Sequence, residues 1–112
     1  MAALSIDSLF DAAIRIQVME RSITLTFTEN SVHIKFPTTR RLAEFLDVPH
    51  YYILPYFAMM EEEELITRAE RIGILTTAKG SRKIIALVQE NYQKEVAEIL
   101  GPEIYSVLTR CS

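Results

Sequence analysis

The spacing of apolar residues switches between a helical and a strand period along the chain, and this switching limits the possible folds more than any other feature. Apolar residues at helical spacing predict helices over 5–19, 40–46, 51–64 and 81–100. Strict alternation predicts β-hairpins over 22–36 and 66–77. The order is helix, hairpin, helix, helix, hairpin, helix, so the chain is expected to be an α+β protein.

Residues with strong local preferences mark several boundaries. Ser5 is a favourable N-cap for the first helix, although the apolar pattern leaves both helix and strand open for residues 13–20. Thr38 or Thr39 can cap the helix of 40–46. Gly101 is followed by a proline, which ends the long helix, and a final turn or two follows.

The chain has 112 residues, 49% of them apolar, which suits one domain over 1–112 with a core that needs no metal or disulfide. The one cysteine, Cys111, has no disulfide partner within the chain, which is typical of a reducing compartment. Charged residues interrupt every apolar run before it reaches roughly 18 residues, so no membrane partner is predicted. We therefore expect a cytoplasmic protein.

Charge is distributed unevenly. The formal net charge is −3, which disfavours a nucleic-acid partner, and residues 61–64 are four consecutive glutamates. Residues 65–83, however, carry five basic side chains against Glu70, a net charge of +4. A phosphate backbone responds to local charge, so this segment keeps nucleic acid among the candidate partners.

Three short motifs follow one another over 38–100. LAEFLDV (42–48) is followed by apolar residues five, eight and twelve positions after its valine, at Ile53, Tyr56 and Met60. LITR (65–68) and TTAKG (76–80) come next. The series resembles the winged helix-turn-helix of MarR-like and related archaeal and bacterial regulators, with a motif core over 38–80.

The resemblance implies that a short helix braces a recognition helix in the DNA major groove, while a β-hairpin wing lies on the phosphates. An extra N-terminal β-hairpin and a long C-terminal helix, 81–100, would extend this fold. Double-stranded DNA is the implied partner. The positions carried over to the recognition helix are His50, Tyr51, Tyr52 and Pro55, and the phosphate contacts are Arg40, Arg41, Arg68 and Arg71.

Two residues depart from the family pattern. Pro55 lacks a helical N–H donor, so the recognition helix is expected to be kinked or to begin late. Glu64 stands where relatives have glycine and must occupy a tight helix exit. No Arg or Lys occurs between Asp47 and Thr67, which excludes bidentate guanine readout by this helix and leaves histidine, tyrosine and apolar contacts.

The residues predict no catalytic, cofactor or metal site. Four consecutive glutamates on a helix point in four directions and cannot converge on one ion. His50 has no cysteine or second histidine nearby, and His33 alternates with apolar neighbours and is expected to face solvent. The three glycines form neither a dinucleotide fingerprint nor a phosphate loop, so we do not expect an enzyme.

Two functions stay open. The first is a DNA-binding transcriptional regulator that pairs as a homodimer. The second is a winged helix that binds another protein and not DNA, which the net acidity and the apolar recognition helix favour. Helix 81–100 carries more apolar residues than one face needs, so Tyr92, Val96 and Ile99 are predicted at a dimer seam. Alternatively, this helix covers the hairpin 22–36 within one chain.

Overall fold

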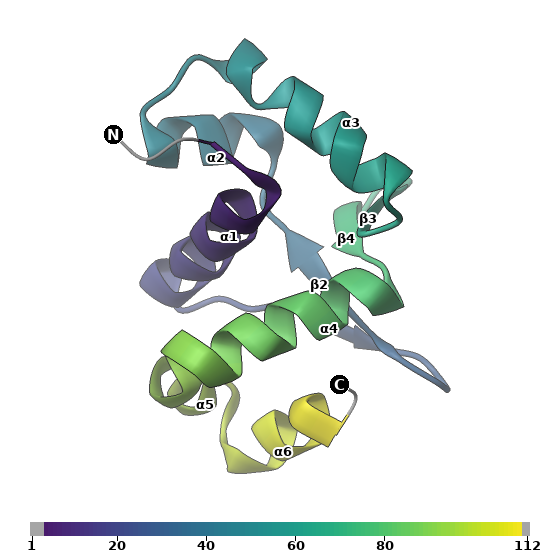
Figure 1. Ribbon diagram of the computed structural model, residues 1–112. Helices are drawn as coiled ribbons and strands as arrows, with labels where there is room; N and C mark the ends of the chain where they lie inside the picture. The colour runs from purple at the N-terminus through teal and green to yellow at the C-terminus, as the bar shows by residue number, and fades with distance from the viewer. Residues whose placement is uncertain (1–3, 111–112) are drawn as a thin grey trace.

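Capping side chains fix where the helices start. A computed structural model describes residues 4–110 (Figure 1). In α1 the Ser5 and Ser8 side chains bond each other's backbone N–H groups in a capping box. Thr38 caps α2, and Thr77 caps α4 through the N–H of Gly80. The helices and helical segments are α1 (Ile6–Glu20), α2 (Thr39–Leu46), the 3₁₀ turn η1 (His50–Tyr52), α3 (Leu54–Glu62), α4 (Ala78–Leu87), the π-helical segment η2 (Val88–Tyr92), α5 (Gln93–Leu100) and α6 (Pro102–Arg110).

Four strands form one antiparallel sheet in the order β1-β2-β4-β3. The strands are β1 (Leu25–Phe27), β2 (Val32–Phe36), β3 (Ile66–Ala69) and β4 (Gly73–Thr76). Leu25 pairs with Ile34 in the first hairpin, and Thr67 pairs with Leu75 in the second. Phe36 of β2 pairs with Ile74 of β4, so β2 joins the two hairpins. Both predicted hairpins are therefore confirmed. Residues 13–20 lie in α1, so the prediction of a helix there is confirmed and the strand alternative is not.

The core lies between one face of the sheet and the helices. Alternation along β2 buries Val32, Ile34 and Phe36. The Phe36 ring lies 5.2 Å from that of Phe10 in α1 and 5.8 Å from that of Phe57 in α3, between ring centroids. In Figure 1, α1 and α4 lie across β2, and α3 lies at the far end from α6.

Buried hydroxyls join α4 to the sheet. The Thr76 hydroxyl accepts a hydrogen bond of 2.8 Å from the Ile34 N–H and lies 2.7 Å from the Ser81 Oγ. Ser81 donates in turn to the Val32 carbonyl at 2.5 Å. Because these polar groups are buried and satisfied, they fix the register of α4 on the strands.

A second set of contacts joins the start of α4 to the loop between α3 and β3. Thr77 donates from its N–H to the Leu65 carbonyl at 3.1 Å and from its hydroxyl to the Glu64 carbonyl. The Lys79 ammonium donates to the Glu63 carbonyl at 3.0 Å. Glu64 has a φ of +60°, so the tight helix exit expected at this position is present without glycine.

The structure corrects the predicted last long helix and the expected exposure of His33. The last long helix begins at Ala78 instead of 81, and Tyr92 leaves helical geometry with φ −133° and ψ 19°. A π-helical turn over 88–92 precedes this break, so α4 and α5 are separate helices, although no proline or glycine marks the position. His33 is also half-buried, because its Nδ1 lies 2.9 Å from the Thr76 carbonyl oxygen of β4.

Candidate nucleic-acid interface

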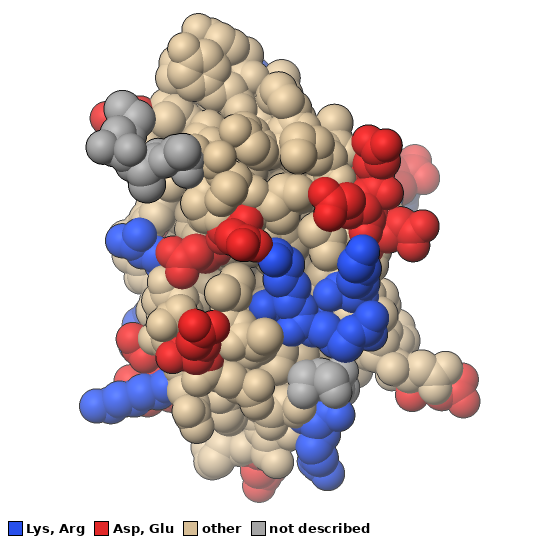
Figure 2. All heavy atoms as spheres, viewed as in Figure 1, with Lys and Arg blue, Asp and Glu red and all other residues tan. Residues whose placement is uncertain are grey.

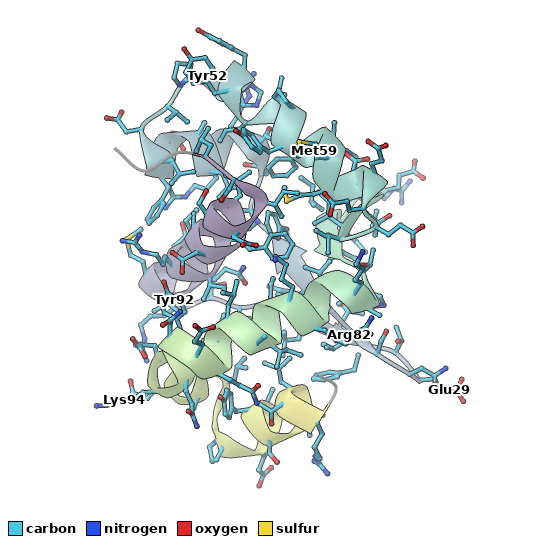
Figure 3. All side chains as sticks on the ribbon, viewed as in Figure 1. Glu29, Tyr52, Met59, Arg82, Tyr92 and Lys94 are labelled. Carbon is cyan, nitrogen blue, oxygen red and sulfur yellow. The ribbon has the colours of Figure 1, made fainter. Side chains whose placement is uncertain are left out.

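The two tyrosines predicted to contact bases precede α3. Pro55 lies in the first turn of α3, which starts at Leu54, so the predicted helix of 51–64 begins late, and residues 50–52 form the 3₁₀ turn η1. Tyr51 and Tyr52 are 64% and 49% exposed, and their rings meet edge to face with centroids 4.7 Å apart. Figure 3 labels Tyr52 at one end of the molecule. The pair projects two phenols and a large apolar area into solvent.

His50, in the same turn, forms a hydrogen bond within the chain. Its Nε2 lies 2.7 Å from the Thr39 hydroxyl at the start of α2, and the side chain is half-buried. This hydrogen bond links η1 to α2. The Nε2 atom is therefore already engaged within the chain, and Tyr51 and Tyr52 are the more exposed members of the predicted set.

The two arginines at the start of α2 differ in their surroundings. Arg41 is turned toward α1, where its Nε and Nη2 lie 3.1 and 3.0 Å from the Glu20 carboxylate. Arg40 is exposed and makes no ion pair within residues 4–110. Of the two, only Arg40 carries a charge that no carboxylate offsets.

The two arginines predicted for the wing show the same contrast. Arg68 on β3 pairs with Glu61 at the end of α3, with 3.0 Å between Nε and Oε1. Arg71 lies in the turn between β3 and β4, is exposed, and has no ion-pair partner in the part of the chain that the structure describes. Its φ of +69° places it in the left-handed region that a tight turn requires.

The basic segment 65–83 is divided by the fold. Lys79 and Lys83 lie on α4 and contact Glu63 and Asp7, whereas Arg71 lies in the turn between β3 and β4. Figure 2 shows basic side chains gathered over the start of α4, beside a group of acidic ones, and a surface without charge over much of α3. The segment therefore does not act as one continuous basic patch.

The residues predicted for a dimer seam are mainly packed within the chain. Val96 is 2% exposed and belongs to the core, so placing it at the centre of a seam was wrong. The Tyr92 hydroxyl donates to Asp11 of α1 at 2.6 Å. Ile99 is half-buried. The alternative, that this region covers the first hairpin, agrees with the shared apolar cavity that Val96 lines with Ile23 and Leu25.

The sequence did not indicate three carboxylates that engage residues of the predicted sites. Glu20 pairs with Arg41, Glu61 pairs with Arg68, and Asp11 accepts from Tyr92. Each pair joins two different elements, and no local motif indicates which carboxylate a given arginine will reach. Burial, together with the hydrogen bond and the charge of Asp11, raises the pKa of Tyr92 to about 12.

No family model, curated protein or solved structure matches this chain. Within residues 4–110 no helix is long and apolar enough to cross a membrane. The same residues contain no group of three metal-ligating His, Cys, Asp or Glu side chains. Cys111 lies outside the described residues.

Proposed function

We propose that the chain is a winged helix-turn-helix domain that binds double-stranded DNA as a cytoplasmic transcriptional regulator, paired with a second copy of itself. The order α1, β2, α2, α3, β3, β4 and the pairing of β2 with β4 support this fold. The α2–η1–α3 segment supplies the two helices and the turn of the motif, and the β3–β4 hairpin supplies the wing. Strand β1 extends the sheet beyond β2.

One observation carries the proposal. Tyr51 and Tyr52 stand exposed at the N-terminal end of α3, which is the end of a recognition helix that meets base edges. Their hydroxyls can donate and accept hydrogen bonds, and their rings can contact thymine methyl groups. Arg40 and Arg71 supply the unpaired charges for phosphate contacts.

The salt dependence of DNA binding tests this proposal. Two phosphate contacts per protomer predict that a dimer releases counterions with a slope of about −3 to −4 in a plot of log K against log salt. Fluorescence anisotropy with labelled random duplex DNA measures this slope. The double variant Arg40→Ala/Arg71→Ala is expected to lose most of the salt dependence, whereas Lys94→Ala on α5 is expected to keep the original slope. Absence of binding at low ionic strength contradicts the proposal.

A second candidate function is a winged helix that binds a protein partner. The observation that favours it is the lack of any Arg or Lys between positions 42 and 67, together with the engagement of Arg41 and Arg68 by carboxylates. In this case, the exposed tyrosines would be the apolar anchors of the interface. Two results together select this function. The chain does not bind DNA at low salt, and the variant Tyr51→Ala no longer binds a purified protein partner.

A further inference from the structure

A hollow of about 600 Å³ lies between the start of α1, the middle of α3 and the start of α4. Its apolar lining comes from Leu4, Ile6, Tyr56, Met59 and Leu65. Figure 3 labels Met59, which is exposed, on the side of α3 toward α1. The hollow is open to solvent on one side, and its apolar lining suits an aliphatic or aromatic side chain.

Four charged side chains complete the lining. Two are carboxylates, Asp7 and Glu63, and two are ammonium groups, Lys79 and Lys83. Figure 2 shows acidic and basic side chains meeting over this part of the molecule. The lining therefore carries no net charge, but it presents both signs beside one apolar surface.

Contacts within the chain hold both ammonium groups in place. Lys83 Nζ lies 2.5 Å from Asp7 Oδ1 and 5.7 Å from the centroid of the Phe10 ring. Lys79 Nζ donates to the Glu63 carbonyl at 3.0 Å. An ammonium group has three N–H donors, and each contact uses one, so both lysines keep donors for a ligand. Because these ammonium groups are already held in place, less side-chain conformational entropy is lost when a ligand binds.

We propose that this hollow binds a free α-amino acid with an apolar side chain, in its zwitterionic form. The ligand carboxylate is received by Lys79 and Lys83, and its ammonium group is received by Asp7 and Glu63. Its side chain lies on the apolar lining. Because the two carboxylates and two ammonium groups of the lining balance, a zwitterion keeps the site neutral, whereas a ligand with a single charge adds a charge that nothing in the lining offsets. The arrangement therefore selects for a zwitterion. This inference rests on the hollow alone and does not depend on DNA binding.

Isothermal titration calorimetry of the intact chain tests the ligand class. L-leucine, L-methionine and L-phenylalanine are the amino acids to titrate. Two matched analogues of leucine each lack one charge: 4-methylpentanoate has no ammonium group, and 3-methylbutylamine has no carboxylate. Saturable binding is expected for at least one amino acid, with both analogues weaker than leucine by about tenfold or more. Binding of 4-methylpentanoate as tight as that of leucine overturns the proposal, as does the absence of saturation by all three amino acids.

Two variants locate the site. Asp7→Asn and Lys83→Met remove one charge of each sign, and each is expected to weaken amino-acid binding by about tenfold. Lys94→Met changes a lysine on α5, outside this hollow, and is expected to bind like the unchanged chain. Circular dichroism establishes that each variant is folded before titration. Unchanged affinity in both Asp7→Asn and Lys83→Met overturns the site.

Discussion

At the scale of single residues, the start of α4 approaches the loop before β3 so closely that position 80 has no room for a side chain. A Cβ atom at Gly80 would lie 1.9 Å from the Leu65 carbonyl oxygen, which is backbone and cannot rotate away. The TTAKG motif of the sequence therefore has a packing reason for its glycine. Its first and second threonines bond the sheet and the loop, and its lysine bonds the loop.

We predict that Gly80→Ala lowers the free energy of unfolding by about 1–3 kcal/mol or more, because α4 must move away from Leu65. Urea denaturation followed by circular dichroism measures this change. Arg82→Ala, which places alanine at an exposed position two residues along the same helix, is the matched control and should change stability little. Equal stability of Gly80→Ala and the unchanged chain would show that the loop can relax at no cost.

The hydrogen bond from Tyr92 to Asp11 predicts a specific dependence of stability on alkaline pH. The pKa of Tyr92 is raised from 10.0 to about 12 by burial, with further contributions from the hydrogen bond and charge of Asp11. A raised pKa means that the folded chain holds this proton more tightly than the unfolded chain. The resulting stabilisation is complete below pH about 10 and is lost as pH rises through about 12.

We therefore expect Tyr92→Phe to be less stable than the unchanged chain at pH 8, by about 1 kcal/mol for the lost hydrogen bond. Above pH about 10, its free energy of unfolding should fall less steeply with pH, because the group that titrates is gone. Urea denaturation at several pH values gives both quantities. Tyr51→Phe, which alters an exposed tyrosine outside the Tyr92–Asp11 hydrogen bond, is the matched control. If the free energy of unfolding falls equally steeply with pH in Tyr92→Phe and in the unchanged chain, Tyr92 is not the group whose titration lowers stability.

At the scale of elements, the sequence was sufficient wherever a local rule decides the structure. Alternation predicted the hairpins, because one face of β2 and one face of β4 are buried. Pro55 predicted the late start of α3, because proline is accommodated in the first turn of a helix. The break at Tyr92 could not be predicted, since it depends on contacts such as the one with Asp11, 81 residues away. For the same reason, the ion pairs of Arg41 and Arg68 became visible only in the fold.

The β3–β4 hairpin, which is the proposed wing, offers a comparison between two arginines. Arg71 has no ion-pair partner among the described residues, whereas Arg68 is paired with Glu61. We predict that Arg71→Ala weakens binding to all DNA sequences similarly and reduces the salt slope by about one unit per contact. Arg68→Ala should have a smaller effect, because the Arg68 guanidinium is already engaged by Glu61 and is not among the proposed phosphate contacts. Anisotropy across a salt series distinguishes the two variants, and a larger effect of Arg68→Ala would contradict the assignment.

At the scale of the whole molecule, the burial of Val96 changes where a second copy can pair. Ile104 on α6 is 43% exposed, and Ile99 on the adjacent α5 is half-buried, so these residues keep apolar area for a partner. We expect sedimentation to show a dimer at tens of micromolar that Ile104→Lys converts to a folded monomer. Ile72→Lys, which alters an exposed isoleucine of the wing, should remain dimeric. A monomer before any substitution removes the homodimer from the proposal.

The proposed DNA interface lies at the α3 end of the molecule, away from α6 (Figure 1). Nuclear magnetic resonance maps it residue by residue, by titrating a short DNA duplex into the ¹⁵N-labelled chain at low salt. The proposal predicts shifts of the backbone amides of Tyr51 and Tyr52, of Arg40, and of the wing turn at Arg71, with little change along α5 and α6. Shifts confined to α5 and α6, or no shifts at all, would contradict a DNA-binding helix-turn-helix.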